Sequence, residues 1–119
     1  MKENVLQQKS YVFALRMIQV GNQLIKNKEY IISKQIIKSG TYIGANVEEA
    51  IGGHTEKEFH YKLNIAYKEA RETKYWLRLL RDSDQIDSAV AQACIEDIEE
   101  LLRILGSILI TMHNKKHKR

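Results

Sequence analysis

Hydrophobic residues recur at helical spacing in four stretches of the chain, and the third stretch shows the pattern most clearly. Its apolar and small residues alternate in steps of four and three, at Phe59, Leu63, Ala66, Ala70, Thr73, Leu77 and Leu80. This spacing is typical of a helix that packs along one face for its whole length. Thr55, followed three residues later by Glu58, predicts a capping box at the start of this helix.

The other three stretches follow the same period less regularly. The second has Ile32, Ile36, Gly40, Ile43, Val47 and Ala50 on one face. The fourth has Val90, Cys94, Ile98, Leu101, Leu105, Ile108 and Met112, with Asp84, Asp87 or Ser88 as its N-cap. In the first stretch we assign the packed face to Val5, Tyr11, Leu15, Ile18 and Ile25. Gly40 and Gly44 either admit a neighbouring side chain closely or kink the second helix, and we favour close packing.

Polar and glycine-containing clusters separate these stretches and set the expected boundaries. We expect helices over about 4–26, 30–51, 55–82 and 87–113, followed by a basic tail over 114–119. Short connections make consecutive helices run in opposite directions. The sequence therefore predicts a single all-α domain over 1–119, an up-down-up-down antiparallel four-helix bundle.

The composition agrees with such a fold and indicates the cellular compartment. The chain has 119 residues, no proline and one cysteine, Cys94, so an intramolecular disulfide is excluded. A lone cysteine fits a reducing compartment. The first residues carry no signal-peptide core, and the longest apolar run, 104–112, is too short to cross a bilayer. We expect a cytoplasmic protein with no membrane partner.

The net charge of +4 is concentrated at one end of the chain. Lys115, Lys116, Lys118 and Arg119 supply it, and acidic and basic residues balance over the rest. One interpretation is a solvated terminus that improves solubility. The other is an arm that seeks phosphate groups, because clustered cations displace counterions from nucleic acid.

Two flanks of the third helix carry different side chains. A basic flank bearing aromatic residues contains His60, Tyr67, Arg71, Lys74 and Arg78. Of these, Arg71, Lys74 and Arg78 are nucleic-acid-binding candidates. The opposite flank is apolar and contains Tyr61, Ile65, Trp76 and Leu79. It belongs either to the core or to a subunit interface centred on Trp76, and both interpretations remain open.

The sequence offers no set of side chains for catalysis, a metal or a cofactor. The Glu-x-x-His pattern of dimetal bundles is absent, and His113 and His117 lie in the cationic tail, where repulsion opposes metal binding. Cys94 falls on an apolar helix face, where a thiol is usually inert. Asn46 and Glu49 share a flank of the second helix, and they either fix helix register or face a ligand.

One run of residues resembles a known family. It begins with the run Ser39-Gly40-Thr41-Tyr42-Ile43-Gly44-Ala45-Asn46-Val47-Glu48-Glu49-Ala50. It continues with Lys57-Glu58-Phe59, Leu63, Ile65-Ala66 and Lys68-Glu69-Ala70-Arg71-Glu72-Thr73-Lys74-Tyr75-Trp76-Leu77. It resembles the four-helix-bundle proteins named for open reading frames in bacterial 23S rRNA intervening sequences. The resemblance implies a small cytoplasmic bacterial protein that is not an enzyme and forms a homo-oligomeric ring, typically a pentamer.

The resemblance also implies particular residues and partners. The family's signature positions correspond to Asn46, Glu49 and Glu72. The accessory proteins of diversity-generating retroelements are similar in fold and bind nucleic acid, although they are strongly basic and the body of this chain is neutral. We therefore expect a non-catalytic, self-associating module that binds structured RNA or a nucleoprotein partner. The alternatives are a protein-interaction scaffold with no nucleic-acid role, and an enzyme that uses Asn46, Glu49 and a residue of an adjacent helix.

Overall fold

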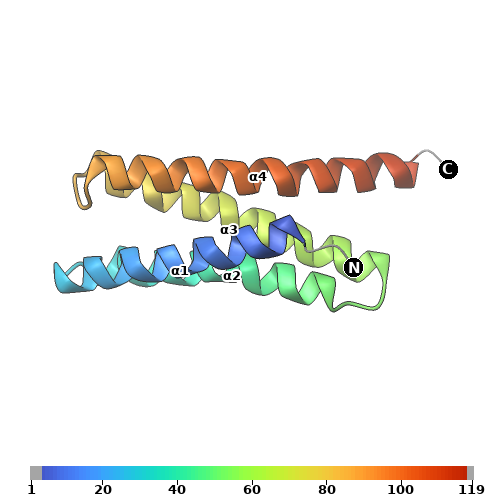
Figure 1. The fold of residues 1–119 in the computed structure, drawn as a ribbon, viewed down its shortest axis with the longest axis horizontal. Coiled ribbons are helices and arrows are strands. Elements are labelled where there is room, and N and C mark those ends of the chain that lie inside the picture. Colours follow the sequence, from blue (N-terminus) through green and yellow to red (C-terminus); the bar gives the residue numbers. More distant parts are fainter. Residues whose placement is uncertain (1–3, 118–119) are drawn as a thin grey trace.

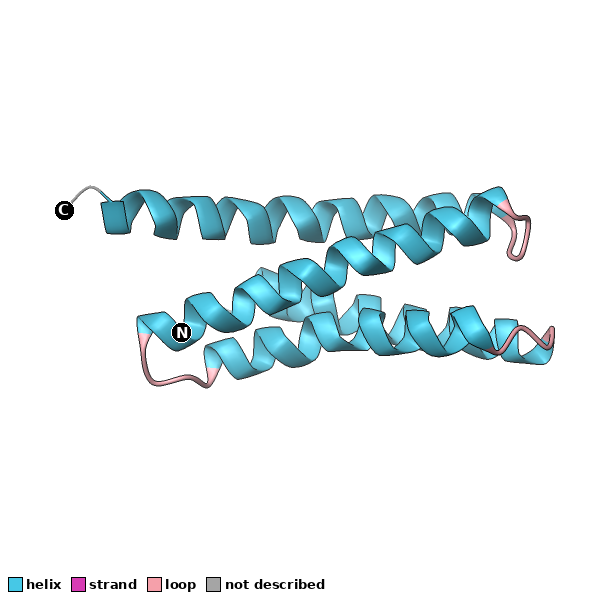
Figure 2. Ribbon diagram, turned by 180° about the vertical axis from the view of Figure 1, so that it is seen from behind, coloured by secondary structure: helices cyan, strands magenta, loops and turns pink. Residues whose placement is uncertain are grey.

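Four helices account for nearly all of residues 4–117, the part of the chain that the computed structural model describes. They are α1 (Val5–Lys26), α2 (Ile31–Ile51), α3 (Glu56–Asp82) and α4 (Ser88–His117). Consecutive helices run in opposite directions and are joined by short connections (Figure 1). Within residues 4–117 the remainder is loop and turn, without strands (Figure 2). The all-α four-helix prediction is confirmed.

The helix ends follow the expected boundaries closely, except at the end of α4. This helix continues to His117 instead of stopping near 113, so Lys115 and Lys116 lie on it and not in a separate tail. Neither glycine nor proline follows residue 113 to end the helix. Cations in the last turn also interact favourably with the negative end of the helix dipole.

Side chains cap the first turn of all four helices. At the start of α2, Glu29 Oε1 accepts from the Ile32 amide at 2.7 Å and from the Ser33 amide at 3.2 Å. The Gln7 amide donates to Asn4 Oδ1 at 3.0 Å, and the Val90 amide donates to Asp87 Oδ2 at 3.3 Å, which identifies Asp87 as the cap of α4. The predicted cap of α3 is present, with the Glu58 amide donating to Thr55 Oγ1 at 3.0 Å. The Glu58 carboxylate accepts from the His54 amide at 2.7 Å, one residue earlier than a standard capping box.

The predicted packed faces of α2, α3 and α4 form most of the core. On α3 every predicted position from Leu63 to Leu80 is buried and Phe59 is half-buried. On α2 the same holds from Ile36 to Ala50. The α4 face is buried from Cys94 to Leu105, but Val90 is 41% exposed, and its neighbour Ala91 is buried in its place.

The predicted face of α1 is wrong. All five residues assigned to it (Val5, Tyr11, Leu15, Ile18 and Ile25) are exposed. The buried line consists of Leu6, Ser10, Phe13, Met17, Val20, Gly21 and Leu24. Both lines have helical spacing, and the buried one includes a serine and a glycine that a hydrophobicity pattern counts as polar or neutral. Their small size lets α2 approach, which the pattern alone does not reveal.

Glycines bring α1 and α2 into close contact. A Cβ added at Gly40 would lie 2.4 Å from Met17 Cγ, and one added at Gly44 would lie 3.3 Å from the Ser10 carbonyl oxygen. The third glycine belongs to α1: a Cβ added at Gly21 would lie 2.3 Å from the Ile37 side chain of α2. Helix α2 continues through both of its glycines from Ile31 to Ile51. The close-packing interpretation of Gly40 and Gly44 is confirmed.

Helix α4 packs mainly against α3 and meets α1 less extensively. In Figures 1 and 2, α4 runs along one side of the bundle, away from the α1–α2 pair. Two ion pairs join α1 to α4, between Lys9 and Glu100 at 3.2 Å and between Arg16 and Asp97 at 2.9 Å. Among the described residues, two ion pairs also join α3 to α4 and one joins α2 to α3, but the α1–α4 contact is the least extensive, so ion pairs make up a larger share of it.

We expect Gly40→Ala to destabilise the protein by about 1–3 kcal/mol, because the new methyl group overlaps the buried Met17 side chain. Gly106→Ala on α4 is the matched control, since its Cβ would lie 3.6 Å from Tyr67, an ordinary contact. Its gain in helix propensity should stabilise the protein by about 0.5–1 kcal/mol. Urea unfolding followed by circular dichroism measures both, and equal stabilisation by the two variants would contradict the packing argument.

Candidate functional site

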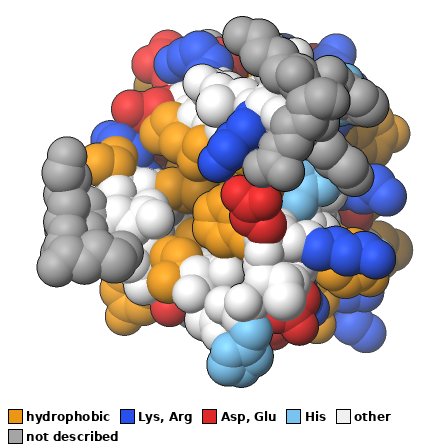
Figure 3. Space-filling view, turned by 90° about the vertical axis from the view of Figure 1, so that its right-hand side faces the viewer, with side chains coloured by type: hydrophobic (Ala, Val, Ile, Leu, Met, Phe, Trp, Pro, Cys, Tyr) orange, Lys and Arg blue, Asp and Glu red, His pale blue; other side chains and the backbone are white. Residues whose placement is uncertain are grey.

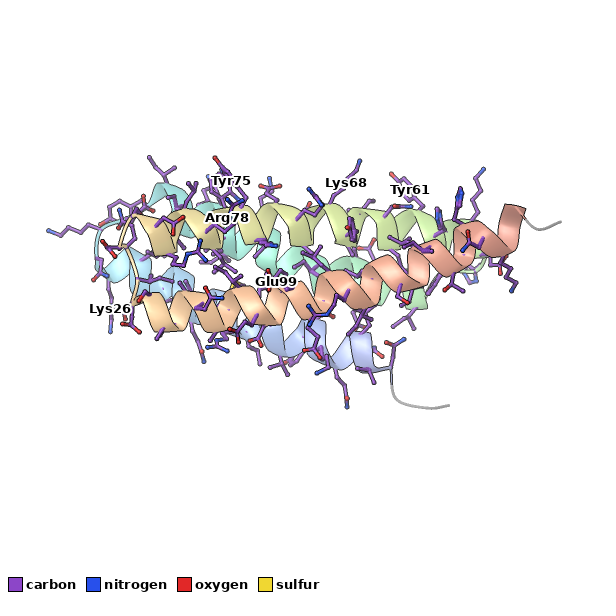
Figure 4. The ribbon with its side chains drawn as sticks, turned by 90° about the horizontal axis from the view of Figure 1, so that it is seen from above. Lys26, Tyr61, Lys68, Tyr75, Arg78 and Glu99 are labelled. Carbon is purple, nitrogen blue, oxygen red and sulfur yellow. The ribbon has the colours of Figure 1, made fainter. Side chains whose placement is uncertain are left out.

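The outer face of α3 carries a line of exposed side chains at steps of four and three. We call it the α3 stripe, and it consists of Lys57, Tyr61, Asn64, Lys68, Arg71, Tyr75 and Arg78. Figure 4 labels Tyr61, Lys68, Tyr75 and Arg78 along this helix. Aspartate and glutamate are absent from the line until Asp82. The stripe therefore carries four cations and two tyrosines, with the exposed Glu72 beside it one turn from Lys68.

The stripe overlaps only in part with the predicted nucleic-acid-binding residues. Arg71 and Arg78 belong to it. Lys74 is half-buried, and its Nζ lies 3.1 Å from Glu99 Oε2 on α4, so this carboxylate compensates its charge. Sequence reasoning missed Lys57 and Lys68, although their spacing from Arg71 and Arg78 was visible in the chain.

The four cations of the α3 stripe differ from many other lysine and arginine residues of the bundle in that they form no ion pair within residues 4–117. Within residues 4–117, Lys57, Lys68, Arg71 and Arg78 form none of the ion pairs, which involve Lys9, Arg16, Lys62, Lys74, Arg81 and Lys115. A cation outside an ion pair keeps its field available to an incoming anion, although Arg81 and, more weakly, Arg78 lower the pKa of Asp82 at the end of the line. The α3 stripe is thus a more favourable anion-binding surface than a surface with the same number of ion-paired cations.

The C-terminal cations are described only in part. Lys115 is exposed on α4, with Nζ 3.6 Å from Glu56 Oε2, and Lys116 belongs to the same helix. Lys118 and Arg119 lie outside the described residues. At this end of the bundle, acidic, basic and hydrophobic side chains are interspersed over the visible surface (Figure 3).

The signature residues Asn46, Glu49 and Glu72 each contact a neighbouring group of the bundle. Asn46 is half-buried, and its Nδ2 donates to the Tyr42 carbonyl at 2.8 Å. Glu49 is exposed and lies 2.6 Å from Lys62 Nζ on α3, and this hydrogen bond raises the pKa of Lys62. Glu72 accepts from the Trp76 indole at 3.2 Å. Of these contacts, the Glu49–Lys62 pair links α2 to α3, whereas the Asn46 bond lies within α2 and the Glu72 bond within α3.

The predicted apolar flank of α3 is partly covered. Ile65 and Trp76 are half-buried, whereas Tyr61 is 62% and Leu79 37% exposed. The Trp76 ring also meets the Tyr75 ring edge-on, with centroids 5.2 Å apart. The flank therefore contributes to the packed bundle and leaves an apolar edge open to solvent.

A larger exposed apolar surface lies on α1. We call it the α1 seam, and it consists of Tyr11, Leu15, Ile18, Asn22 and Ile25, again at steps of four and three. Its four apolar members are between 39% and 63% exposed. The seam continues into a shallow, mainly apolar groove between α1 and α2, lined by Ile25, Tyr30, Ser33, Lys34, Ile37, Lys38, Thr41 and Tyr42. The sequence analysis assigned Tyr11, Leu15, Ile18 and Ile25 to the packed face of this helix and did not include Asn22.

The described residues offer little for redox, nucleophilic or metal chemistry. Burial raises the pKa of the Cys94 thiol, which lies fully inside the core. Within residues 4–117, no three His, Cys, Asp or Glu side chains gather in a way that could hold a metal ion. Across the same range, none of the helices has the length and apolar character needed to span a membrane.

Comparison with known proteins identifies the family. Residues 2–107 match the model of the 23S rRNA-intervening sequence proteins. This chain belongs to that family. The family resemblance noted in the sequence is thereby confirmed, and the match extends from before α1 into α4.

A solved structure supports the same assignment. A crystal structure of a protein of unknown function from the S23 ribosomal protein family of Bacteroides thetaiotaomicron is 42% identical and superposes with a TM-score of 0.86. The alignment covers 88% of this chain and 98% of that one. No curated protein gives a match.

We expect Cys94 to react slowly with a thiol reagent in the folded protein. Its raised pKa means that fewer thiolates are present at any given pH, and burial also blocks access. At pH 8 the native protein should react at least about tenfold more slowly than the urea-unfolded chain, and the native rate should still be rising above the usual thiol pKa of about 8.5. Comparable native and unfolded rates would show that Cys94 is accessible.

Proposed function

We propose that this protein is a non-catalytic, self-associating helical bundle that binds structured RNA. The observation that carries the proposal is the α3 stripe, in which Lys57, Lys68, Arg71 and Arg78 are exposed and outside the ion pairs of residues 4–117. Cations of this kind release counterions when they contact phosphates. The family name refers to 23S rRNA and the name of the relative's family to a ribosomal protein, which makes RNA the ligand class to test first.

Self-association is the second part of the proposal. The α1 seam presents Tyr11, Leu15, Ile18 and Ile25 to solvent in the line that a packed helix normally buries. Contiguous exposed apolar surface of this kind marks an interaction site. Following the family resemblance, we propose a homo-oligomeric ring, with the pentamer as the first arrangement to test, acting in the cytoplasm.

The two parts depend on each other through charge. Apart from its last residues the chain has no net charge, so one bundle binds RNA weakly. An oligomer brings several stripes and several C-terminal cation groups onto one RNA. Linked sites raise the effective local concentration, and avidity can then exceed single-site affinity by about a hundredfold or more.

We expect the double variant Leu15→Ser/Ile18→Ser to shift the protein toward its 13.9 kDa monomer mass, because it removes apolar side chains from the centre of the α1 seam. Val12→Ser is the matched control: Val12 is 63% exposed on α1 but lies outside the seam. Light scattering at micromolar concentration measures all three masses. A monomeric wild-type protein would contradict self-association, and an unchanged mass for the double variant would contradict the α1 seam as its surface.

We expect replacement of Lys115, Lys116, Lys118 and Arg119 by glutamine to weaken RNA binding and to reduce its salt dependence. For every phosphate that the variant no longer neutralises, the slope of log affinity against log salt should become shallower by about 0.7–0.9. The oligomer mass should not change, since Lys115, whose side chain is described, pairs with Glu56 at the start of α3 and not with the α1 seam.

Fluorescence anisotropy with a labelled RNA hairpin at several salt concentrations measures both quantities. An unchanged affinity and slope would reduce the terminal cations to a solubility feature. If the wild-type protein bound no RNA at low salt, the RNA-binding proposal would be wrong and a protein-interaction scaffold would be favoured.

A further inference from the structure

We infer that the α3 stripe binds an unpaired stretch of RNA, with phosphates at Lys57, Lys68, Arg71 and Arg78 and bases stacked on Tyr61 and Tyr75. This inference rests on the proposed RNA-binding function and adds to it the site, the contacts and the kind of RNA segment.

The order of side chains along the stripe fits one strand lying along the helix. From Lys57 to Arg78 the stripe is about 31 Å long, and the two tyrosines are about 21 Å apart, from the rise of 1.5 Å per residue. Lys68 and Arg71 lie between the tyrosines, and Lys57 and Arg78 lie beyond them. A strand that reaches both rings therefore passes cations before, between and after its stacked bases.

The tyrosines are open enough to accept bases. Tyr61 is 62% and Tyr75 52% exposed. Neighbouring groups also restrain them, since the Trp76 ring packs edge-on against Tyr75 and Lys62 Nζ lies 5.8 Å from the centroid of the Tyr61 ring. Stacking on such rings tolerates any base, because every base has a π-face.

The tyrosines favour unpaired nucleotides over a duplex. Bases inside a duplex are stacked on one another, and the deep major groove of an A-form helix is too narrow for side chains to read. A surface that met only duplex phosphates would need cations alone. A second copy of this stripe is disfavoured as the occupant, because its four cations would face four like charges.

The tyrosine experiment uses the full-length protein, a single-stranded oligouridylate and a blunt RNA duplex of the same length. Tyr61→Ala/Tyr75→Ala should lower affinity for the single strand about tenfold or more and leave duplex affinity unchanged. Tyr61→Phe/Tyr75→Phe should retain affinity, because phenylalanine also stacks. Tyr30→Ala, at a tyrosine 61% exposed in the α1–α2 groove, should behave like wild type.

A charge-matched pair tests the phosphate contacts. Lys68→Gln should weaken single-strand binding and lower its salt slope by about 0.7, whereas Lys34→Gln, in the α1–α2 groove, should not. Single-strand binding should also change the fluorescence of Trp76, the one tryptophan in the chain, because its ring lies 5.2 Å from that of Tyr75. Light scattering and circular dichroism on each variant check that mass and fold are unchanged.

Each contrary result has a distinct meaning. If structured RNA binds but none of the stripe variants changes its affinity, the site is wrong and the proposed function stands. If Lys68→Gln weakens binding while the tyrosine variants do not, the stripe contacts phosphates only and the inference of unpaired nucleotides is overturned. If no RNA binds but polyglutamate binds through Lys68, the partner is an acidic protein surface, and both the inference and the proposed function fail.

Discussion

The contact between α1 and α2 determines much of the surface that this protein presents. Gly40 and Gly44 remove the side chains that would otherwise hold α1 away, and the Met17 side chain and the Ser10 backbone occupy that space. A contact this close fixes the rotation of α1 about its axis. Because Leu6 through Leu24 then face inward, the second apolar line of the helix must face solvent. The α1 seam is thus a consequence of core packing as well as a property of its own residues.

Sequence patterns predicted the elements and three of the four core faces because each of those helices has one dominant apolar line. Thr55 and Glu58 also predicted the start of α3, since capping depends on residues close in sequence. The face of α1 could not be predicted in this way. Its two apolar lines have equal spacing, and the choice between them depends on small residues of α2 that are distant in sequence.

The same distinction between local and distant information applies to the candidate site. The spacing of Arg71 and Arg78 was sufficient to place both on one exposed face of α3. Lys74 is close to them on the helix, but Glu99 of α4 compensates its charge, and that pairing depends on how two helices align. The contact of Glu49 could likewise not be predicted from local spacing, because its partner Lys62 comes from the next helix.

The boundary between α1 and α4 gives the bundle a side that can open. Its two ion pairs, Lys9–Glu100 and Arg16–Asp97, join side chains that are about one-third to one-half exposed, where salt screens attraction between charges. The other three boundaries are more extensive and bury more apolar surface, which salt does not screen, although ion pairs also join α2 to α3 and α3 to α4. Partial unfolding should therefore begin by separation of α4 from α1, with the α3–α4 connection intact. A helix from another copy could then enter the gap, so crowded, salt-rich conditions would favour exchange of helices between bundles.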